Sequence, residues 1–367
     1  MIVIAGHLCL DIIPAIPAAP EPLAQRLLPG SLLNVGAPTL STGGAVANTG
    51  LALHRLGVPV RLMAKVGADP FATVIRALLS KHDPGLGQHL LEAPDSPTSY
   101  TLVLDPPGGD RTFLHCPGAN DTFTADELLA QDFSGANIVH FGYPPLMRQM
   151  YSDEGRQLVQ LFKGFRERGL TTSLDMALPD PESPAGKAPW QAILPATLPY
   201  VDLFTPSLDE IVYMLDPALG LELRKKIAQG VKLGGLSTQD IRNICRDLLG
   251  MGCGAVLLKL GNQGAYACVG EKNARIPANW RGKEMAHACF KQDILAGTTG
   301  AGDTTIAGFL CGLSRGMTLP ETLQLAVATG TACVEKPDAT SGIPKLEILL
   351  ERIKRGWPTL PSCIVSG

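Results

Sequence analysis

The stretch GTTGAGD at residues 297–303 indicates more about the fold than any other part of this chain. It runs directly into residues 306–313, whose apolar side chains recur with helical spacing. Consecutive small residues allow neighbouring backbone N–H groups to point into one concavity, and the positive end of a helix dipole adds to their attraction for an anion. The stretch therefore predicts an anion-binding turn at the start of a helix.

The residue types in this turn limit the kind of anion site that it can form. A Walker A loop needs a lysine that is missing from the stretch, and the glycine spacing differs from that of a dinucleotide-binding turn. Asp303 would repel a bound phosphate unless its carboxylate works as a base toward the hydroxyl group that accepts the phosphate. Asp is also common at the N-cap of a helix, so the local pattern leaves a catalytic and a capping role open.

Segments with strand and helix patterns alternate along the rest of the chain. Strands are predicted at residues 2–5, 61–66, 138–141, 171–175, 201–204 and 255–260. Helices are predicted at residues 45–56, 70–79, 158–165, 241–249, 306–313, 319–334 and 346–353. This order predicts an α/β fold with a mostly parallel central sheet and helices on both faces. Ligands of such sheets bind beyond the carboxyl ends of the strands.

Three stretches do not follow this alternation. Residues 12–42 contain prolines and no helical stripe, and residues 98–115 have the pattern of a hairpin. We expect these two stretches to form a small β subdomain that projects from the main sheet. Residues 178–199 contain six prolines, which predicts an irregular surface loop.

The composition excludes several classes of protein. Hydrophobic residues make up 45% of the 367 residues, which is enough for a large core and too much for a disordered chain. The formal net charge of -3 leaves no basic excess for a nucleic-acid or anionic membrane surface. No run of about eighteen apolar residues indicates a transmembrane helix. Nine cysteines without a CxxC pair or zinc spacing predict reduced thiols and a cytoplasmic protein.

A second glycine-rich stretch, STGGAVAN at residues 41–48, opens the first long helix. Its paired glycines allow a ligand to approach the backbone closely, and Asn48 can both donate and accept hydrogen bonds one turn into the helix. The stretch is equally compatible with a simple strand-to-helix turn.

Taken together, these stretches resemble the PfkB (ribokinase-like) family of carbohydrate kinases. Residues 43–69 are similar to the N-terminal signature of that family, and residues 297–312 are similar to its more specific C-terminal signature. The resemblance covers nearly the whole chain in the right order. It implies a single ribokinase-like α/β domain over residues 1–367, with a β lid formed from residues of about 12–42 and 98–118. It also implies a cytoplasmic enzyme that transfers the γ-phosphate of ATP, with Mg²⁺, to a hydroxyl group of a sugar or sugar-like molecule.

The resemblance assigns roles to individual residues. Asp303 would be the catalytic base, and the N–H groups of Gly300, Ala301 and Gly302 would stabilise charge on the transferred phosphoryl group. The residues implied to bind the acceptor substrate are Asp11, Gly43, Gly44 and Asn48. Those implied to bind the nucleotide are Lys259, Gly261, Gly264, Thr298, Gly330 and Gly342, and the residue implied to help hold Mg²⁺ is Glu210.

Some of these residues also have simpler explanations. Ser207 and Glu210 have the S-x-x-E spacing of a capping box, which needs no metal ion. Asp11 is compatible with an ordinary loop residue, and Lys259 with a solvated charge at the end of a strand. The chain also departs from the family pattern at two positions: Gly297 stands where Asp is frequent, and Ser207 where Asn is frequent. The first departure leaves activation by a monovalent cation in doubt.

The sequence leaves the acceptor open. A sugar phosphate would require several basic side chains near Asp11 and the lid, and Arg111 is the one clearly placed there, which favours a neutral sugar. A nucleoside would stack on aromatic side chains, and Tyr100, Phe113 and Tyr143 could supply them. A non-catalytic sugar or nucleotide sensor of the same fold is a further alternative. Exposed edges of the lid hairpin could also pair two copies into a homodimer.

Overall fold

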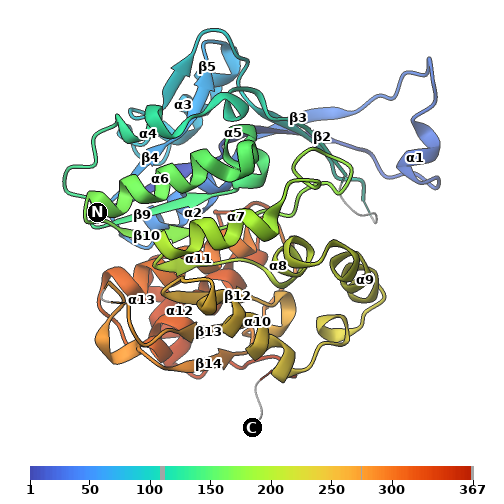
Figure 1. The fold of residues 1–367 in the computed structure, drawn as a ribbon. Coiled ribbons are helices and arrows are strands. Elements are labelled where there is room, and N and C mark those ends of the chain that lie inside the picture. Colours follow the sequence, from blue (N-terminus) through green and yellow to red (C-terminus); the bar gives the residue numbers. More distant parts are fainter. Residues whose placement is uncertain (108–111, 274, 365–367) are drawn as a thin grey trace.

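The structure, a computed structural model, describes residues 1–107, 112–273 and 275–364. Its centre is an eight-stranded sheet in the order β14-β13-β12-β11-β10-β9-β1-β4 (Figure 1). The strands are β1 (Ile2–Gly6), β4 (Val60–Met63), β9 (Ile138–Gly142), β10 (Thr171–Leu174), β11 (Leu203–Phe204), β12 (Ala255–Lys259), β13 (Ala265–Val269) and β14 (Glu284–His287). Six neighbouring strands from β4 to β12 run parallel, while β13 pairs antiparallel with both of its neighbours, β12 and β14. The predicted α/β fold is therefore confirmed.

Helices cover both faces of this sheet because strand side chains alternate between two cores. Ile2 and Ile4 of β1 belong to one core, and Val3 and Ala5 belong to the other. The first core packs against α2 (Ala45–Arg55), α3 (Pro70–Ser80), α11 (Ala301–Ser314), α12 (Leu319–Val334) and α13 (Leu346–Lys354). The second packs against α4 (Ala125–Leu129), α5 (Arg148–Tyr151), α6 (Arg156–Glu167), α7 (Trp190–Thr197), α8 (Leu208–Leu215), α9 (Pro217–Ala228) and α10 (Thr238–Gly250).

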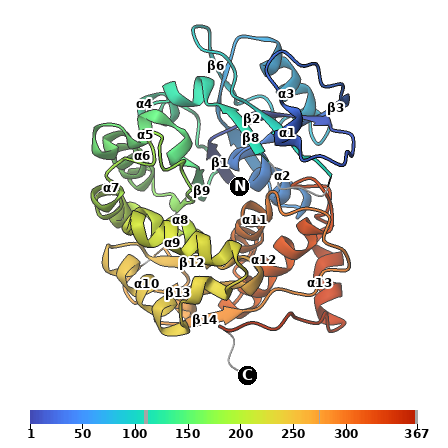
Figure 2. The same cartoon turned by 90° about the vertical axis from the view of Figure 1, so that its right-hand side faces the viewer.

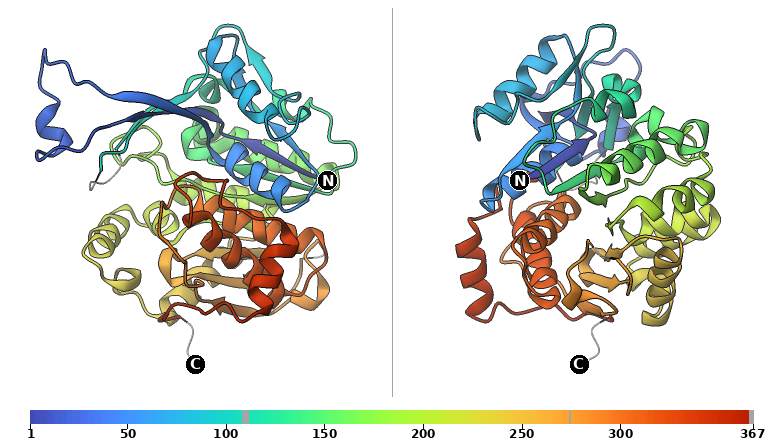
Figure 3. Two further views of the ribbon diagram at one scale, coloured as in Figure 1. Left: turned by 180° about the vertical axis from the view of Figure 1, so that it is seen from behind. Right: turned by 60° about the vertical axis from the view of Figure 1, so that its left-hand side comes forward.

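A four-stranded sheet in the order β3-β2-β7-β8 stands beside the main sheet (Figure 2). Its strands are β2 (Cys9–Ala15), β3 (Gly36–Gly43), β7 (Tyr100–Leu104) and β8 (Thr112–Cys116). The chain between β2 and β3 carries the short helix α1 (Leu23–Arg26) and projects far from the body as an arm (Figure 3). The predicted stretches 12–42 and 98–115 thus contribute strands to one sheet. Residues 108–111, which include Arg111, lie outside the described part of the chain.

Two predicted segments differ from the structure. The strand predicted at 61–66 is divided at Ala64 into β4, in the main sheet, and β5 (Lys65–Gly67), which pairs with β6 (Leu91–Ala93). The surface loop predicted at 178–199 is wrong in its second half, because α7 forms there with Pro195 in its interior. Trp190 and Ile193 of α7 are almost fully buried, and this burial outweighs the low helix propensity of proline.

The local signals for helix starts are confirmed. Pro70 is the first residue of α3, and the Asp69 carboxylate accepts a hydrogen bond from the Ala72 N–H at 3.0 Å. Within the described ranges, no helix combines the length and the apolar composition that crossing a bilayer would require.

Candidate active site

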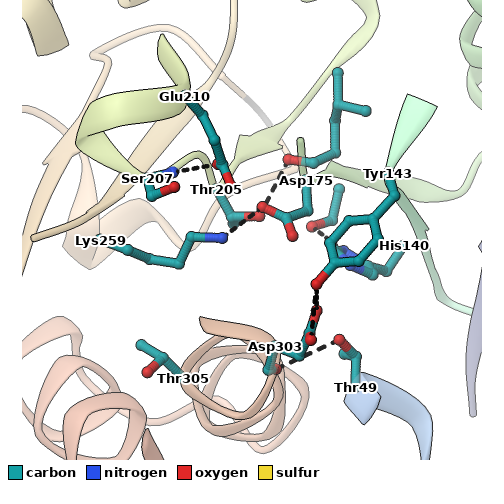
Figure 4. A network of polar contacts seen from close by, with 12 residues as sticks. Thr49, His140, Tyr143, Asp175, Thr205, Ser207, Glu210, Lys259, Asp303 and Thr305 are labelled. Atoms are coloured by element: carbon teal, nitrogen blue, oxygen red, sulfur yellow. Dashed lines mark hydrogen bonds and ion pairs between the residues drawn. The ribbon is translucent and has the colours of Figure 1, made fainter. Parts of the chain in front are cut away.

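Asp303 lies in the first turn of α11, almost fully buried beyond the carboxyl end of the main sheet. Its Oδ2 accepts a hydrogen bond from Asn48 Nδ2 at 2.9 Å. The Tyr143 hydroxyl donates to Oδ1 and Oδ2, at 2.9 and 2.8 Å (Figure 4). Burial raises the pKa of Asp303, and the contacts with Asn48, Lys259 and Tyr143 offset part of this rise. The N-cap of α11 is Gly300 rather than Asp303, so the capping role that the sequence left open is wrong.

The backbone of the turn before Asp303 requires glycine. Gly300 has a φ of 76°, and a Cβ atom at this position would lie 2.3 Å from the Cβ of Ala339. The Gly300 carbonyl accepts the Thr304 N–H at 2.9 Å, which starts α11. The Ala301 N–H donates to the Thr298 carbonyl at 3.3 Å. Of the three N–H groups expected to bind an anion, that of Ala301 therefore already has a partner within the chain.

Lys259 and Asp175 form a buried ion pair at the carboxyl ends of β12 and β10. Lys259 Nζ lies 2.7 Å from Asp175 Oδ1, and the two side chains are 10% and 1% exposed. Burial lowers the pKa of Lys259, but the carboxylates of Asp175 and Glu210 outweigh this effect and raise it. Burial raises the pKa of Asp175, and the positive charge of Lys259 offsets this rise only in part. Lys259 is therefore a charged residue within the site and not a solvated strand end.

Glu210 lies in the first turn of α8, where its Oε2 accepts the Ser207 N–H at 2.7 Å. Burial raises the pKa of Glu210, and Lys259 lowers it. The carboxylate thus acts in the cap of α8 and also lines a pocket with Lys259 and Asp303. The capping role and a role in the site are compatible.

Asp11 lies on β2, opposite the glycine-rich stretch at residues 41–48. A Cβ atom on Gly43 would lie 2.3 Å from Asp11 Oδ2, so glycine at this position leaves room for the carboxylate. Gly44 has a φ of 87°, and its Cβ would lie 2.6 Å from His7 Nδ1. Burial raises the pKa of Asp11 to about 6, while hydrogen bonds from Cys9 and Thr101 act in the opposite direction.

Two pockets lie on either side of Asp303 and Asn48. The first, which we call the Lys259 pocket, has a volume of about 620 Å³ and is lined by Tyr143, Glu210, Lys259, Gly300, Gly302 and Asp303, among others. The second, the Asp11 pocket, has a volume of about 480 Å³ and is lined by residues of the small sheet, α2, α3 and the loop 337–341. It includes Asp11 and Asn48. The Asn48–Asp303 hydrogen bond therefore connects the two pockets.

Comparisons with known proteins identify the family of the chain. The model of the pfkB family of carbohydrate kinases matches residues 2–346. The chain belongs to this PfkB family. Over 327 residues it is 26% identical to 2-dehydro-3-deoxygluconokinase of Bacillus subtilis, an alignment that covers 87% of this chain and 89% of that protein.

Solved structures show the same ribokinase-like fold. Ribokinase of Arabidopsis thaliana, in complex with ribose and ATP, has a TM-score of 0.70 at 20% identity over 96% of this chain and 98% of that chain. An Escherichia coli protein provisionally named ribokinase II, in complex with ATP and Mg²⁺, has a TM-score of 0.70 at 19% identity. The match covers 96% of this chain and 99% of that chain. At these identities the likeness establishes the fold.

Several residues that the PfkB resemblance assigns to the nucleotide have other contacts in the structure. A Cβ atom on Gly330 would lie 2.2 Å from Thr305 Oγ1, so Gly330 lets α12 approach α11 closely. Gly342 packs against the Ala332 carbonyl in the same way, and Gly264 against the His287 carbonyl. Gly261 lines the Lys259 pocket, whereas Gly264, Thr298, Gly330 and Gly342 are not among its lining residues as far as the structure describes the chain.

The donor set of this PfkB site suits Mg²⁺. Asp175, Glu210 and Asp303 surround a single ammonium group, and among the described residues nothing hydrogen-bonds to the buried Oδ2 of Asp175. No three His, Cys, Asp or Glu side chains in the described ranges are close enough to hold a metal ion by themselves. Mg²⁺ commonly keeps several waters and binds one or two carboxylates together with substrate phosphates, so these residues fit that mode.

Two residues of the site were missed by sequence reasoning. Asp175 ends a predicted strand, and an acidic residue at the carboxyl end of a parallel strand was an available signal. For Tyr143 the sequence indicated only an aromatic ring on which a nucleoside could stack, although the residue directly follows β9 and precedes Pro144. No local pattern shows that its hydroxyl reaches Asp303, because the two residues are 160 positions apart.

Proposed function

We propose that this protein transfers the γ-phosphate of ATP, with Mg²⁺, to a hydroxyl group of a sugar or sugar-like molecule. The observation that carries the proposal is the position of Asp303 between the two pockets. One is lined by the glycine-rich start of α11 and Lys259, and the other by the Asp11 carboxylate and the small β sheet. The acceptor would occupy the Asp11 pocket, and the phosphates of ATP would occupy the Lys259 pocket.

Each residue of the site has a chemical task in this reaction. Asp303 takes the proton of the acceptor hydroxyl as that oxygen bonds to the γ-phosphorus. Lys259 and the N–H groups at the start of α11 stabilise negative charge on the phosphoryl oxygens. Asp175 and Glu210 would hold Mg²⁺ near the phosphates, where the ion neutralises charge. The Asp11 carboxylate accepts hydrogen bonds from other hydroxyl groups of the acceptor and orients it.

The four-stranded sheet would act as a lid over the acceptor. Strand β2 carries Asp11, and strands β2, β3, β7 and β8 all contribute to the wall of the Asp11 pocket. Excluding water matters for a kinase because water can accept the phosphate in place of the sugar.

The direct test is ADP release with Mg²⁺ and ATP over a panel of sugars, sugar acids, sugar phosphates and nucleosides. One acceptor should drive ADP release in the wild type, and Asp303→Asn should abolish it. Glu351→Gln, which changes an exposed carboxylate on α13, is the matched control and should behave as the wild type. ATP binding without turnover over the whole panel would instead support a non-catalytic sensor.

A second candidate is an acceptor with an anionic group. The structure brings Arg55, Lys81 and His82 to the Asp11 pocket, although the sequence indicated only Arg111 near the acceptor. Burial lowers the pKa of His82, and the charges of Arg55 and Lys81 lower it further. The positive charges of Arg55 and Lys81 favour a carboxylate or phosphate, so Lys81→Ala should raise the KM of an anionic acceptor and leave that of its neutral analogue unchanged.

We also propose that two copies pair through their lids. The outer strands of the small sheet are β3 and β8, whose edges can accept further strands. The arm exposes Leu27, Leu28, Leu32 and Val35, of which Leu32 is 88% exposed. A monomer leaves such an apolar arm in water, whereas an isologous dimer covers it.

A further inference from the structure

Tyr143 occupies a position on Asp303 that the reaction requires for another group. Its hydroxyl donates to both carboxylate oxygens, at 2.9 and 2.8 Å. Tyr143 lines the Lys259 pocket, whereas Asn48, which also donates to the Asp303 carboxylate, lines the Asp11 pocket. The phenol therefore contacts the base from the side of the Lys259 pocket, where the phosphates of ATP are proposed to bind. Figure 4 shows its hydroxyl directed at the Asp303 carboxylate. In phosphoryl transfer, the acceptor oxygen must lie between the base and the γ-phosphorus, which is the side of Asp303 that the phenol covers.

The backbone at Tyr143 supports a functional reason for this residue. Tyr143 has φ 66° and ψ 45°, in the left-handed region, and the next two residues are the buried Pro144 and Pro145. Glycine adopts this conformation without strain, whereas a bulky side chain does so at a cost. Strained residues of this kind concentrate at functional sites. At the end of β9 this unfavourable backbone conformation coincides with the contact between the phenol and Asp303.

We propose that the Tyr143 hydroxyl occupies the place of the acceptor hydroxyl on Asp303, and that the acceptor must displace it before phosphate can be transferred. This inference rests on the proposed function. When no acceptor is bound, the phenol keeps water from the base. Without that protection, a water oxygen attacks the γ-phosphorus, the bond to the bridging oxygen of ADP breaks, and Asp303 takes the proton. Tyr143 is therefore a gate that suppresses wasteful hydrolysis of ATP.

The test is ATP hydrolysis with Mg²⁺ and no acceptor, read as ADP release. Tyr143→Phe keeps the ring and removes only the hydroxyl, so hydrolysis should rise about 10-fold, the effect expected for one hydrogen bond to a charged group. The double variant Tyr143→Phe/Asp303→Asn should lose this gain, because the water reaction uses the same base. Tyr213→Phe is the matched control: its hydroxyl bonds to the Gly186 carbonyl at 3.1 Å away from Asp303, and hydrolysis should stay at the wild-type rate.

Acceptor kinetics give a second readout. With the acceptor found in the panel, Tyr143→Phe should lower KM about 10-fold and leave kcat within about 3-fold, because a competitor is removed while the base remains. A lower kcat with unchanged ATP hydrolysis would show that the phenol only positions Asp303, and would overturn the gate. Tyr143→Gly, which suits the left-handed backbone, should give the same rise in hydrolysis if Tyr143→Phe is unstable.

Failure of the gate and failure of the proposed function are distinguishable. Faster hydrolysis in Tyr143→Phe without any acceptor in the panel supports the gate and leaves the acceptor assignment unsupported. Turnover of an acceptor by the wild type, with unchanged hydrolysis and KM in Tyr143→Phe, overturns the gate alone. If ATP binds but neither protein hydrolyses it, the gate is also overturned.

Discussion

At the scale of one residue, the ionised carboxylate of Asp303 that the proposed catalysis requires is unfavourable for folding. Burial raises its pKa, so the ionised carboxylate is less stable in the folded protein than in the unfolded chain. Above the folded-state pKa this cost is fully present. It decreases as the pH falls below that pKa and vanishes once the pH lies below the lower pKa of the unfolded chain. The hydrogen bonds from Asn48 and Tyr143 reduce this cost because they favour the ionised carboxylate.

Asp303→Asn should therefore separate activity from stability. We expect kcat to fall by at least about 100- to 1000-fold. At neutral pH the variant should melt at a temperature no lower than the wild type, since the amide carries no buried charge. The difference in melting temperature between Asp303→Asn and the wild type should become smaller as the pH is lowered. Turnover numbers and calorimetric melting at several pH values check both expectations, and a kcat near that of the wild type would exclude Asp303 as the base.

The pKa of Asp11 predicts the pH dependence of acceptor binding. Burial raises this pKa to about 6, so Asp11 takes up a proton as the pH falls below that value. A neutral carboxyl group accepts hydrogen bonds less well, and the KM of the acceptor should rise below about pH 6. KM measured from about pH 5 to about pH 8 checks this. In Asp11→Asn, KM should be high throughout and lack this dependence.

At the scale of elements, close packing of α11 against α12 positions the base. A Cβ atom on Gly330 would meet Thr305 Oγ1 at 2.2 Å, and one on Gly308 would meet Thr329 Oγ1 at 2.6 Å. The two glycines thus let the helices approach closely along their length. Because Asp303 lies in the first turn of α11, a shift of this helix also moves the carboxylate away from Asn48.

Gly330→Ala should accordingly lower both stability and activity. Overpacking of this kind costs about 1–3 kcal/mol, which urea unfolding can measure, and kcat should fall with it. Gly250→Ala at the end of α10 is the control. Among the described residues nothing lies within 4 Å of its would-be Cβ, so the alanine should leave activity unchanged and should not destabilise the protein. Equal stability of the two variants would contradict the packing argument.

At the scale of the whole molecule, the main sheet and the small sheet meet at the site. The main sheet supplies Lys259, Asp175 and Tyr143 from the ends of three strands, and the small sheet supplies Asp11. The arm between β2 and β3 lies beyond both and contributes no side chain to either pocket wall among the described residues (Figure 3). The exposed leucines of the arm therefore have a role other than lining the active site.

Dimerisation through the lid predicts how surface variants affect the oligomeric state. We expect light scattering to show a dimer for the wild type and a monomer for Leu32→Asp, because a buried charge opposes pairing. Leu221→Asp changes a leucine that is 39% exposed on α9, away from the lid, and should remain a dimer. A wild type that is monomeric at working concentration would contradict the lid-pairing proposal.

Much of the fold could be predicted from local sequence because its causes are local. The helix 319–334 and the start of α3 follow from side-chain periodicity and capping, which involve residues a few positions apart. The turn at 297–303 follows from its small residues in the same way. By contrast, α7 was missed because the burial of Trp190 depends on distant parts of the chain.

The same distinction between local and long-range causes applies to the residues of the site. The sequence alone determined which residues could act on a phosphate or on its acceptor: the glycines of the 297–303 turn, Asp303 and Asn48 all stand in recognisable local patterns. Only the tertiary structure decided that Tyr143 covers Asp303, that Asp175 pairs with Lys259, and that Arg55 and Lys81 reach the Asp11 pocket. The physical reason is that periodicity and capping act over a few residues, whereas these contacts arise from strand order and helix packing, which bring together segments far apart in the chain.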